Sequence, residues 1–300
     1  MKTVAEAGSP STKVPLSRRL RAFLSRPPRA KYAAIALRVQ SVFPAVPFPI
    51  RLPFGGWWLA RGSALDSELL LGSFERAELA FVEKFVQPGM VFLDVGAHHG
   101  LYTLLASRKV GPAGKVIAFE PSPRERKRLK EHLRLNACRN VTTEDFALSD
   151  LSRTADLYLV DGSQDWCNSL RPPRLTEKTH AVSVRTVCLD EYLSRHSVSS
   201  VDFVKLDVEG AELSVLLGAK RLLASASRPV FLVEVQDIRT GPWGYRAREI
   251  VSLLIQNNYL WYSLTGDGLL LPARLDVENF DANLVAIPAE RDKIVAHLLG

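Results

Sequence analysis

The chain has 300 residues, of which 47% are hydrophobic and 24% are charged, a composition typical of a globular protein with one main domain and a sizeable core. Its three cysteines, Cys138, Cys167 and Cys188, are odd in number and include no C-x-x-C pair, so neither a disulfide framework nor a zinc knuckle is indicated. We therefore expect a protein of the reducing cytoplasm.

The formal net charge of +7 is unevenly distributed along the chain. Residues 1–60 hold ten basic residues against Glu6 alone, which gives this segment +9 and the remaining 240 residues −2. We predict a basic N-terminal extension over 1–60, partly disordered or forming a helical cap, and a main domain over 61–300. A solvated leader is the simplest interpretation of the extension. Peripheral contact with an anionic membrane is the alternative, and we expect no nucleic-acid partner.

Two features of the extension resemble targeting signals without meeting their requirements. Arg18-Arg19 is followed by charged residues and prolines instead of the uninterrupted apolar run of an export signal. Residues 33–50 are apolar but contain Arg38 and three prolines, which argues against a membrane-spanning helix. We expect neither export nor a transmembrane segment here, and a short interfacial or capping helix is the alternative for 33–50.

Helices and strands are predicted to alternate from residue 73 onward. Apolar residues at helical spacing predict helices over 73–86, 102–108, 123–136, 211–224 and 245–258. Apolar runs predict strands over 91–95, 115–120, 141–146, 202–208, 229–235, 259–265 and 283–287. Residues 154–160 and 181–187 are expected to form an inserted hairpin around the polar loop 161–179. This order predicts an α/β fold with a doubly wound, mostly parallel seven-stranded sheet and helices on both faces.

The first strand runs into a glycine-rich turn, VFLDVGAHHG, which ends at Gly100. A dinucleotide fingerprint needs a glycine where this chain has Ala97, and an anionic Asp94 would repel a pyrophosphate. Facing the ammonium group and the sulfonium of S-adenosylmethionine, the same aspartate is favourable. We therefore favour S-adenosylmethionine over NAD. The alternative is that Asp94 only caps the helix and that Gly96 and Gly100 only make a tight turn.

The next two strand ends carry further candidate cofactor contacts. Glu120 ends the second strand, followed by Pro121, and its carboxylate can accept hydrogen bonds from both ribose hydroxyls. NAD-binding proteins use an acidic residue in the same way, and capping of the next helix is the alternative. At the third strand end, Asp145, Phe146 and Ala147 can form an adenine pocket from a carboxylate, a ring and a backbone amide.

The fourth strand ends in a second acidic turn, VDFVKLDVEGAEL. Side chains alternate along a strand, so Lys205, Asp207 and Glu209 point in one direction if the strand persists that far. Asp207 then lies at the sheet end beside the sulfonium, with Lys205 available to pair with either acid. Attraction to a helix N-terminus explains Glu212 and partly Glu209, but it fits Asp207 poorly. Glu234, near the end of the fifth strand, adds a carboxylate at the same rim.

Five blocks of sequence occur in an order that is typical of one enzyme family. They are VFLDVGAHHGLYTLLAS, AFEPSP, FALSD, VRTVCLDEYL and VDFVKLDVEGAELSVLLGA, within roughly residues 70–240. In this order they resemble the FkbM family of S-adenosylmethionine-dependent methyltransferases. The resemblance implies a class I methyltransferase (Rossmann-like) fold and transfer of a methyl group to a hydroxyl of a sugar or of a secondary-metabolite or lipid-type small molecule.

The resemblance also assigns residues by position. It implies that the turn from Asp94 to Gly100 and the carboxylate of Glu120 hold the cofactor and that Asp207 lies at the reaction centre. His98 departs from the family pattern G-A-N-x-G, although histidine, like asparagine, can donate a hydrogen bond. We expect no metal site, because His98 and His99 are adjacent and no third ligand is evident.

The implied reaction is a single in-line displacement at the sulfonium methyl, with a carboxylate available to receive the proton of the acceptor. Asp207 or Glu209 is the candidate base. Two segments are expected to form the acceptor pocket, and core packing is the alternative for each of their tryptophans. They are residues 161–180, with Trp166, Asn168 and Ser169, and residues 54–66, with Trp57 and Trp58.

Two other functions remain as alternatives. The first is a nicotinamide-dependent oxidoreductase on a related sheet, which the missing middle glycine disfavours. The second is a non-catalytic module that keeps the fold and docks through its basic extension. The sequence does not indicate which molecule accepts the methyl group, nor the oligomeric state.

Overall fold

The structure is a computed structural model that describes residues 46–162, 164 and 166–300, together with residues 21, 23–25, 31, 32, 35, 38, 39 and 42. Most of the basic extension, including Arg18-Arg19, lies outside the described residues, so its disorder and its contact with a membrane stay predictions. Within the described part of the chain, no helix combines the length and the apolar character needed to cross a bilayer. The three cysteines are free thiols.

An eight-stranded sheet in the order β12-β11-β13-β10-β9-β3-β4-β5 forms the centre of the protein. Five neighbouring strands, from β10 to β5, pair in parallel, and β13 is antiparallel to both of its neighbours. All seven predicted strands are present, and a short eighth strand pairs with β11 at the edge. The doubly wound, mostly parallel α/β prediction is therefore confirmed. The strands are β3 (Val91–Val95), β4 (Lys115–Phe119), β5 (Val141–Glu144), β9 (Phe203–Leu206), β10 (Val230–Gln236), β11 (Tyr259–Leu264), β12 (Leu270–Pro272) and β13 (Asp281–Pro288).

The strand order reverses at the centre of the sheet. The chain runs from β3 outward through β4 to β5 and then returns to β9 on the other side of β3. Open sheets of this kind bind ligands in the crevice at the carboxyl ends of the strands on either side of the reversal. Asp94 is the second-last residue of β3, and Asp207 directly follows β9, so both lie at this crevice.

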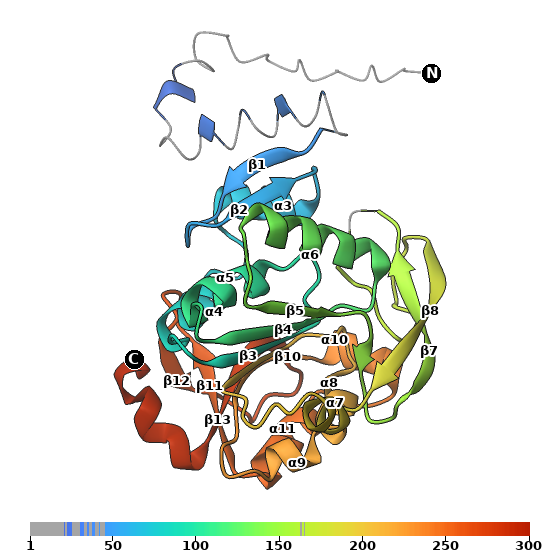
Figure 1. Cartoon of the computed structure of the whole chain (residues 1–300), viewed down its shortest axis with the longest axis vertical. Helices are drawn as coiled ribbons and strands as arrows, with labels where there is room; N and C mark the ends of the chain where they lie inside the picture. The colour runs from blue at the N-terminus through green and yellow to red at the C-terminus, as the bar shows by residue number, and fades with distance from the viewer. Residues whose placement is uncertain are drawn as a thin grey trace, which may run out of the picture.

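Helices cover both faces of the sheet (Figure 1). On one face lie α4 (Arg76–Phe85), α5 (Leu101–Val110) and α6 (Pro123–Leu135); on the other lie α7 (Leu189–Arg195), α8 (Glu212–Leu217), α9 (Lys220–Leu223) and α11 (Arg248–Gln256). Alternate strand residues enter the two cores. Phe92 stacks on Phe203 beneath α4 and α5, with ring centroids 4.9 Å apart, whereas Leu93 packs among side chains of the opposite helices. Burial on both faces explains why these strands are apolar throughout.

The helix predicted over 211–224 is divided in two. α8 ends at Leu217, and α9 begins at Lys220. Between them, a Cβ on Gly218 would lie 2.1 Å from the carbonyl oxygen of Ser149, so the two backbones approach too closely for any side chain. This approach between distant segments is not visible in the helical periodicity of the sequence.

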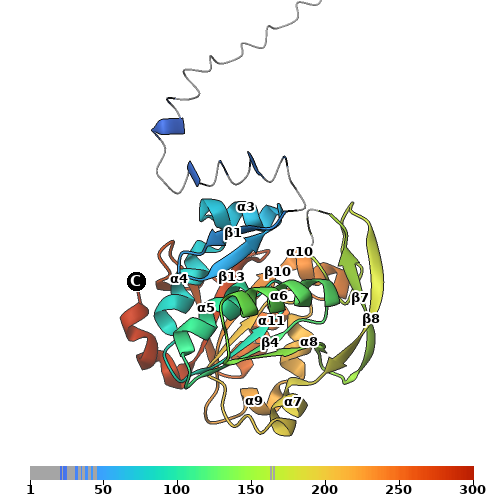
Figure 2. The same ribbon diagram turned by 45° about the horizontal axis from the view of Figure 1, so that its top comes forward.

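A second, three-stranded sheet lies beside the main one (Figure 2). It contains β6 (Ala147–Leu148), β7 (Arg153–Val160) and β8 (Thr179–Val187), in the order β6-β8-β7. β7 and β8 pair antiparallel along their whole length, so the predicted hairpin is confirmed. Its connecting loop folds back, because Ser169 forms a β-bridge with Tyr158 and donates a hydrogen bond to the carbonyl oxygen of Glu209 (2.8 Å). The loop is thereby attached to the turn after β9.

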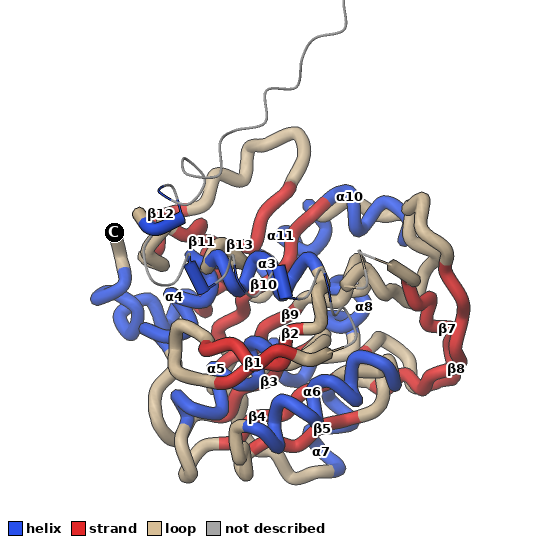
Figure 3. The backbone as a smooth tube through the Cα atoms, turned by 90° about the horizontal axis from the view of Figure 1, so that it is seen from above, coloured by secondary structure: helices blue, strands red, loops and turns tan. Residues whose placement is uncertain are grey.

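Residues 48–72 form a small unit that we call the N-terminal cap (Figure 3). It contains the antiparallel strands β1 (Phe48–Arg51) and β2 (Trp57–Ala60), followed by α3 (Ala64–Leu71). Ser63 and Asp66 form a capping box at the start of α3, and Asp66 also accepts a hydrogen bond from Nε1 of the buried Trp58 (2.7 Å). The cap includes residues on both sides of the predicted domain boundary at residue 60, and that boundary stays a prediction.

The N-terminal cap is held on α6 by polar contacts and one ring stack. Trp58 stacks on His132 with ring centroids 4.0 Å apart, and the side chain of Asn136 exchanges two hydrogen bonds with the backbone of Trp57 (2.7 and 2.8 Å). Three further elements complete the described chain: α10 (Asp237–Thr240) and η1 (Gly241–Trp243) after β10, and η2 (Ala289–Leu298) near the C-terminus.

Candidate active site

A cavity of about 320 Å³ opens at the carboxyl ends of β3, β4, β9 and β10. The N-terminal cap and the loop between β7 and β8 also line it, so two segments outside the sheet close the crevice. This volume lies within the range of small-molecule sites, which is roughly 300–1,000 Å³. The lining residues used below are Trp58, Glu68, Glu75, Asp94, Gly96, Ala97, His98, His99, Tyr102, Glu120, Pro121, Ala147, Trp166, Asn168, Ser169, Lys205, Asp207, Glu209, Glu234, Gln236 and Arg239.

The turn after β3 brings the two central strand ends into contact. Gly96 has φ 88°, and a Cβ there would lie 1.8 Å from the carbonyl oxygen of Asp207. Only glycine fits this position, both for its backbone conformation and for its lack of a side chain. Asp94 is buried beneath the turn and accepts a hydrogen bond from the hydroxyl of Thr103 (2.5 Å). Burial raises the pKa of Asp94 to about 6, against the opposing effect of that hydrogen bond.

Glu120 joins two turns at the end of β4. Its Oε2 accepts a hydrogen bond from the backbone N–H of His98 (2.7 Å), and its Oε1 accepts one from the N–H of Ser122 (2.8 Å). Burial, reinforced by the neighbouring Glu125 carboxylate, raises the pKa of Glu120 to about 8. Each oxygen retains acceptor capacity, and the residue lines the cavity, so it can also receive hydroxyl groups of a ligand.

Of the three predicted adenine contacts, Ala147 lines the cavity, whereas Asp145 and Phe146 are not among the lining residues. Asp145 is exposed and pairs with Arg185 at 2.8 Å. The ring of Phe146 packs in the core beside Phe119 and Tyr192. The reason is that β5 ends at Glu144 and the chain then turns away into β6, which the apolar pattern of this segment does not show.

His98 and His99 lie side by side in the turn after β3, with ring centroids 3.6 Å apart. His98 adopts a left-handed backbone conformation (φ 49°). Its Nε2 and the Nδ1 of His99 are buried without a hydrogen-bond partner among the described residues. Burial lowers the pKa of His98 to about 4 and that of His99 well below its ordinary value. Both rings are therefore neutral near pH 7.

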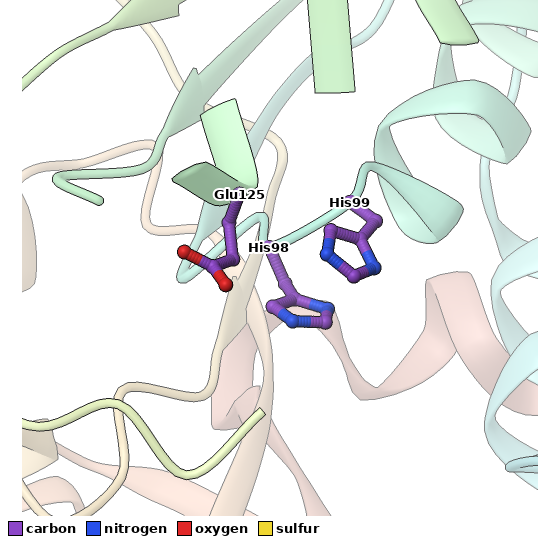
Figure 4. Close-up of side chains that lie close together, drawn as sticks. All are labelled: His98, His99 and Glu125. Atoms are coloured by element: carbon purple, nitrogen blue, oxygen red, sulfur yellow. The ribbon is translucent and has the colours of Figure 1, made fainter. Parts of the chain in front are cut away.

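Glu125 lies beside this histidine pair (Figure 4), close enough that one ligand atom from each of the three residues falls within 4.8 Å of the others. The sequence analysis found no third ligand, and the structure supplies one by folding α6 over the turn. The carboxylate of Glu125 is already engaged, however. It accepts hydrogen bonds from the hydroxyl of Ser122 and from Arg124 Nε (2.6 Å for the arginine), and we assign no metal to these residues.

A buried ion pair lies at the end of β9. Lys205 Nζ donates to Asp207 Oδ2 at 2.8 Å and lies over the ring of Tyr102, 5.1 Å from its centroid. Tyr102 in turn donates a hydrogen bond to Glu75 (2.5 Å). Burial alone would lower the pKa of Lys205, but the carboxylates of Asp207 and Glu75 raise it above its ordinary value. The predicted pairing of Lys205 with an acid is therefore present, and the acid is Asp207.

Two more carboxylates converge on the same end of the cavity. β9 ends before Asp207, and Glu209 has a left-handed backbone (φ 55°), so strand alternation does not extend to it as the sequence analysis assumed. Its Oε2 nevertheless lies 3.0 Å from Nε of Arg239, which is also 3.9 Å from Oε1 of Glu234. Burial raises the pKa of Glu209 to about 8 and that of Glu234 well above its ordinary value. Neighbouring carboxylates also raise the pKa values of both groups.

Glu212 has a different role from these acids. Its Oε1 accepts hydrogen bonds from the backbone N–H groups of Val208 (2.9 Å) and Gly210 (3.2 Å). It therefore stabilises the turn into α8, as expected of an acid at a helix N-terminus. Unlike Asp207 and Glu209, it does not appear among the residues that line the cavity.

Sequence analysis missed five of the charged or polar lining residues. Glu68 lies on α3, Glu75 precedes α4, Tyr102 lies in the first turn of α5, and Arg239 lies on α10. These four do not follow a strand end, which was the signal that the sequence analysis used, whereas Gln236 is the last residue of β10 and could have been found by it. Among the tryptophans it considered, Trp58 and Trp166 line the cavity, whereas Trp57 is 42% exposed and lies outside it.

Comparison with known proteins agrees with this geometry. The model of the FkbM methyltransferase domain matches residues 94–260, which is more than half of the chain. The chain belongs to this family. Membership confirms the resemblance seen in the sequence and makes S-adenosylmethionine the cofactor. The match begins at Asp94 and includes the turns after β3, β4 and β9.

Several curated relatives are similar to parts of the chain. The antimetabolite synthetase AmbE of Pseudomonas aeruginosa is 30% identical over 219 residues, which cover 61% of this chain and 10% of AmbE. The 2-O-methyltransferase NoeI of Sinorhizobium fredii is 29% identical over 46% of this chain and 60% of NoeI. The hexuronic acid methyltransferase AglP of Haloferax volcanii is 32% identical over 46% of this chain and 53% of AglP. The chain thus spans less than two thirds of each of these relatives.

Proposed function

We propose that the protein is an S-adenosylmethionine-dependent O-methyltransferase acting on a hydroxyl of a small molecule. The observation that carries the proposal is the position of Asp207. Its carboxylate faces the cavity, its backbone contacts the glycine turn after β3, and Lys205 fixes its orientation at 2.8 Å. A carboxylate so placed can receive the proton that a hydroxyl loses when it is methylated.

The same cavity supplies the contacts for the cofactor. We propose that its methionine part lies against Gly96, Ala97, His98 and Gly100, close to Asp94, and that the ribose hydroxyls donate to Glu120 beside Pro121. Ala147 then lies beside the adenine. These residues, except Gly100, line the cavity, and Gly100 has φ 89° with Leu129 Cδ1 2.3 Å from the position of a Cβ, so it too is restricted to glycine.

The reaction is a direct displacement. The acceptor oxygen forms a bond to the methyl carbon, the S–C bond breaks with its electron pair going to sulfur, and the acceptor proton passes to Asp207. The products are a methyl ether and S-adenosylhomocysteine. Catalysis depends mainly on holding the acceptor oxygen in line with the S–C bond, which a closed cavity achieves by restricting both reactants.

The proposed acceptor is a sugar or a secondary metabolite with free hydroxyls. Two relatives, named as a 2-O-methyltransferase and a hexuronic acid methyltransferase, support hydroxyl and sugar chemistry in the family. The lining supports it too. Trp58 and Trp166 provide apolar faces, and the side chains of Asn168, Ser169 and Gln236 provide donors and acceptors that suit a polyol.

Labelled S-adenosylmethionine tests this proposal directly. The purified protein should bind it saturably in calorimetry and transfer the label to a hydroxyl compound in an extract of cells lacking the protein. Asp207→Asn should reduce single-turnover methyl transfer by about 10²–10⁴-fold, as expected for loss of a base. Glu209→Gln serves as the comparison for the alternative base.

Three results would contradict parts of the proposal. Absence of S-adenosylmethionine binding by the folded protein, or tighter binding of NAD, would overturn the cofactor and therefore the reaction. A larger loss in Glu209→Gln than in Asp207→Asn would transfer the role of base to Glu209. A label recovered only on nitrogen would exclude O-methylation.

A further inference from the structure

Three carboxylates from different positions converge at the ends of β9 and β10. Asp207 directly follows β9, Glu209 follows it two residues later, and Glu234 lies in β10. One oxygen from each lies within 4.8 Å of the others. In an octahedral Mg²⁺ complex with bonds of about 2.0–2.1 Å, neighbouring ligand oxygens are about 3 Å apart and opposite ones about 4 Å apart. The limit of 4.8 Å exceeds both spacings, so a bound ion would draw the three carboxylates somewhat closer together.

Two positive side chains lie beside this cluster, but they do not satisfy all of its carboxylate oxygens. Lys205 makes one short contact, to Asp207. Arg239 Nε is shared between Glu209 and Glu234, and although it lies 3.0 Å from Glu209 it is not aligned for a hydrogen bond. Oε2 of Glu234 is buried without a partner among the described residues, and only 9% of that side chain is exposed. A buried carboxylate oxygen without a donor is costly, so this atom has unused capacity for a cation.

We propose that Asp207, Glu209 and Glu234 bind one divalent cation, Mg²⁺ or Mn²⁺, and that this ion holds two neighbouring hydroxyls of the acceptor. The role of the ion in catalysis rests on the proposed methyl transfer, whereas the binding of the ion does not. An all-oxygen ligand set selects Mg²⁺ or Mn²⁺ over metals that prefer nitrogen or sulfur. Three protein oxygens leave positions open on an octahedral ion, which a pair of adjacent hydroxyls can fill as a chelate.

The charge of the group favours an ionised acceptor. With all three carboxylates ionised, they sum with Lys205 and Arg239 to −1, and a bound divalent ion would bring the group to +1. An ion here would lower the pKa of the acceptor hydroxyl, whose proton would leave to a water molecule because Asp207 would be engaged by the ion and by Lys205. The acceptor oxygen would then attack the methyl carbon while the S–C electron pair returns to sulfur. The proposed substrate class is therefore a vicinal diol, such as a sugar, in which one hydroxyl is methylated and its neighbour orients the molecule.

The histidine pair does not offer an equivalent site. It has a single carboxylate, Glu125, which is already hydrogen-bonded to Ser122 and neutralised by Arg124, whereas the other cluster sets three carboxylates against two positive charges, Lys205 and Arg239. The carboxylate cluster also faces the proposed position of the sulfonium, whereas the histidines lie at the turn after β3, which we assign to the cofactor. The expectation of no metal, drawn from the histidines alone, did not consider the carboxylates.

Binding of Mn²⁺ to the full chain, followed by electron paramagnetic resonance, tests the ion without relying on activity. We expect one bound Mn²⁺ per chain, displaced by Mg²⁺, and at least a tenfold weaker affinity in Glu234→Gln. The matched control is Glu191→Gln, which removes a half-buried carboxylate that is paired with Arg195 and hydrogen-bonded to Ser152, outside the cavity lining, and should leave Mn²⁺ affinity unchanged. Equal Mn²⁺ affinities in the wild type and Glu234→Gln would overturn the proposal.

S-Adenosylmethionine binding, measured on the same samples, separates this proposal from the proposed function. A protein that binds S-adenosylmethionine but shows no Glu234-dependent Mn²⁺ site contradicts the ion alone. A protein that shows the Mn²⁺ site but does not bind S-adenosylmethionine contradicts the methyltransferase role and retains the ion. Glu234→Gln should keep its S-adenosylmethionine affinity within about threefold, which also shows that the variant is folded.

Catechol and phenol test the vicinal-diol inference as simple probes. Catechol should alter the spectrum of protein-bound Mn²⁺ at concentrations at least tenfold lower than phenol, because only catechol can chelate the ion. Mn²⁺ in buffer and Glu234→Gln with Mn²⁺ correct for binding outside the site. Equal effects of the two probes would contradict the vicinal-diol class while leaving the ion site in place.

Discussion

The carboxylates on the two sides of the cavity have different kinds of partner. On the β3–β4 side, Glu120 accepts two backbone N–H groups and Asp94 accepts a side-chain hydroxyl, so neutral donors from nearby turns hold both acids. On the β9–β10 side, the acids face Lys205 and Arg239, and an oxygen of Glu234 has no partner among the described residues. The first side is already organised for a ligand that brings hydroxyl and ammonium groups, whereas the second retains capacity for a further positive charge.

Gly96 joins the two sides, and its replacement should have the largest effect. In Gly96→Ala, the new methyl group would meet the carbonyl oxygen of Asp207 at 1.8 Å in a left-handed backbone conformation. Over-packing costs about 1–3 kcal/mol, and the left-handed conformation adds about 1–2 kcal/mol. We expect chemical denaturation to show a loss of about 2–5 kcal/mol in the free energy of unfolding, with loss of S-adenosylmethionine binding.

Gly244→Ala provides the matched control for this prediction. Gly244 also has a left-handed backbone (φ 80°, ψ 20°), but the space around its Cβ position is open. Only the conformational cost should appear, about 1–2 kcal/mol, without an effect on cofactor affinity. Equal losses of stability in the two variants would show that the contact between the strand ends is unimportant.

Glu120→Ala should have the next largest effect and should be confined to the β3–β4 side. The substitution removes the acceptor of the ribose hydroxyls and leaves the N–H groups of His98 and Ser122 unpaired, which costs about 1–3 kcal/mol, so the dissociation constant for S-adenosylmethionine should rise by roughly 5–100-fold in calorimetry. Asp145→Asn should leave it within about twofold, because Asp145 is exposed and outside the cavity lining. A clear loss of affinity in Asp145→Asn would instead restore the adenine contact that the sequence indicated.

The buried acids on the β9–β10 side should make the stability of the protein depend on pH. This is the smallest effect that we expect. Burial raises the pKa of Glu209 to about 8, so the folded protein binds a proton that the unfolded chain releases near its ordinary pKa of 4.5. Stability from this group is therefore present at low pH and lost as the pH rises through about 4.5 to 8. Glu234 acts in the same direction, since its pKa is also raised, chiefly by burial.

Thermal melts without added metal should show a melting temperature that falls between about pH 6.5 and pH 8, where Glu209 still acts and the opposing effect of His98 is absent. Glu209→Gln should flatten this slope, and Glu191→Gln should not. His98 acts in the opposite direction at lower pH, because its lowered pKa of about 4 makes stability fall as the pH drops below about 6.5. An unchanged slope in Glu209→Gln would assign the pH dependence to other groups.

The sequence predicted the sheet well because its signals are local. Each predicted strand was an apolar run next to turn residues, and acids such as Glu120 and Asp207 could be placed at strand ends from chain order alone. The same reasoning expected Asp145 and Phe146 at the cavity, where the structure does not place them, since the bend after β5 depends on pairing between β6 and β8. Pairing between segments some forty residues apart leaves no periodic signal in either of them.

Other parts of the site could not be predicted because tertiary packing determines them. Glu75 reaches the cavity from the connection before α4, and Arg239 reaches it from a four-residue helix. The convergence of Asp207, Glu209 and Glu234 likewise depends on the left-handed turn at Glu209, which ordinary strand alternation does not predict. Sequence analysis identified the three acids separately, and the structure shows that they are close enough to act together.

The imidazole of His132 forms hydrogen bonds to both the N-terminal cap and the turn after β3. Its Nε2 accepts the N–H of Leu59 in the N-terminal cap (3.1 Å), so its Nδ1 carries the proton and donates to the carbonyl oxygen of His99 (2.7 Å). One neutral ring thus joins the N-terminal cap, which lines the cavity, to the turn after β3, where we propose that the cofactor binds. A displacement of the N-terminal cap would break a hydrogen bond to the same ring that bonds this turn, so the positions of the two cavity walls depend on each other.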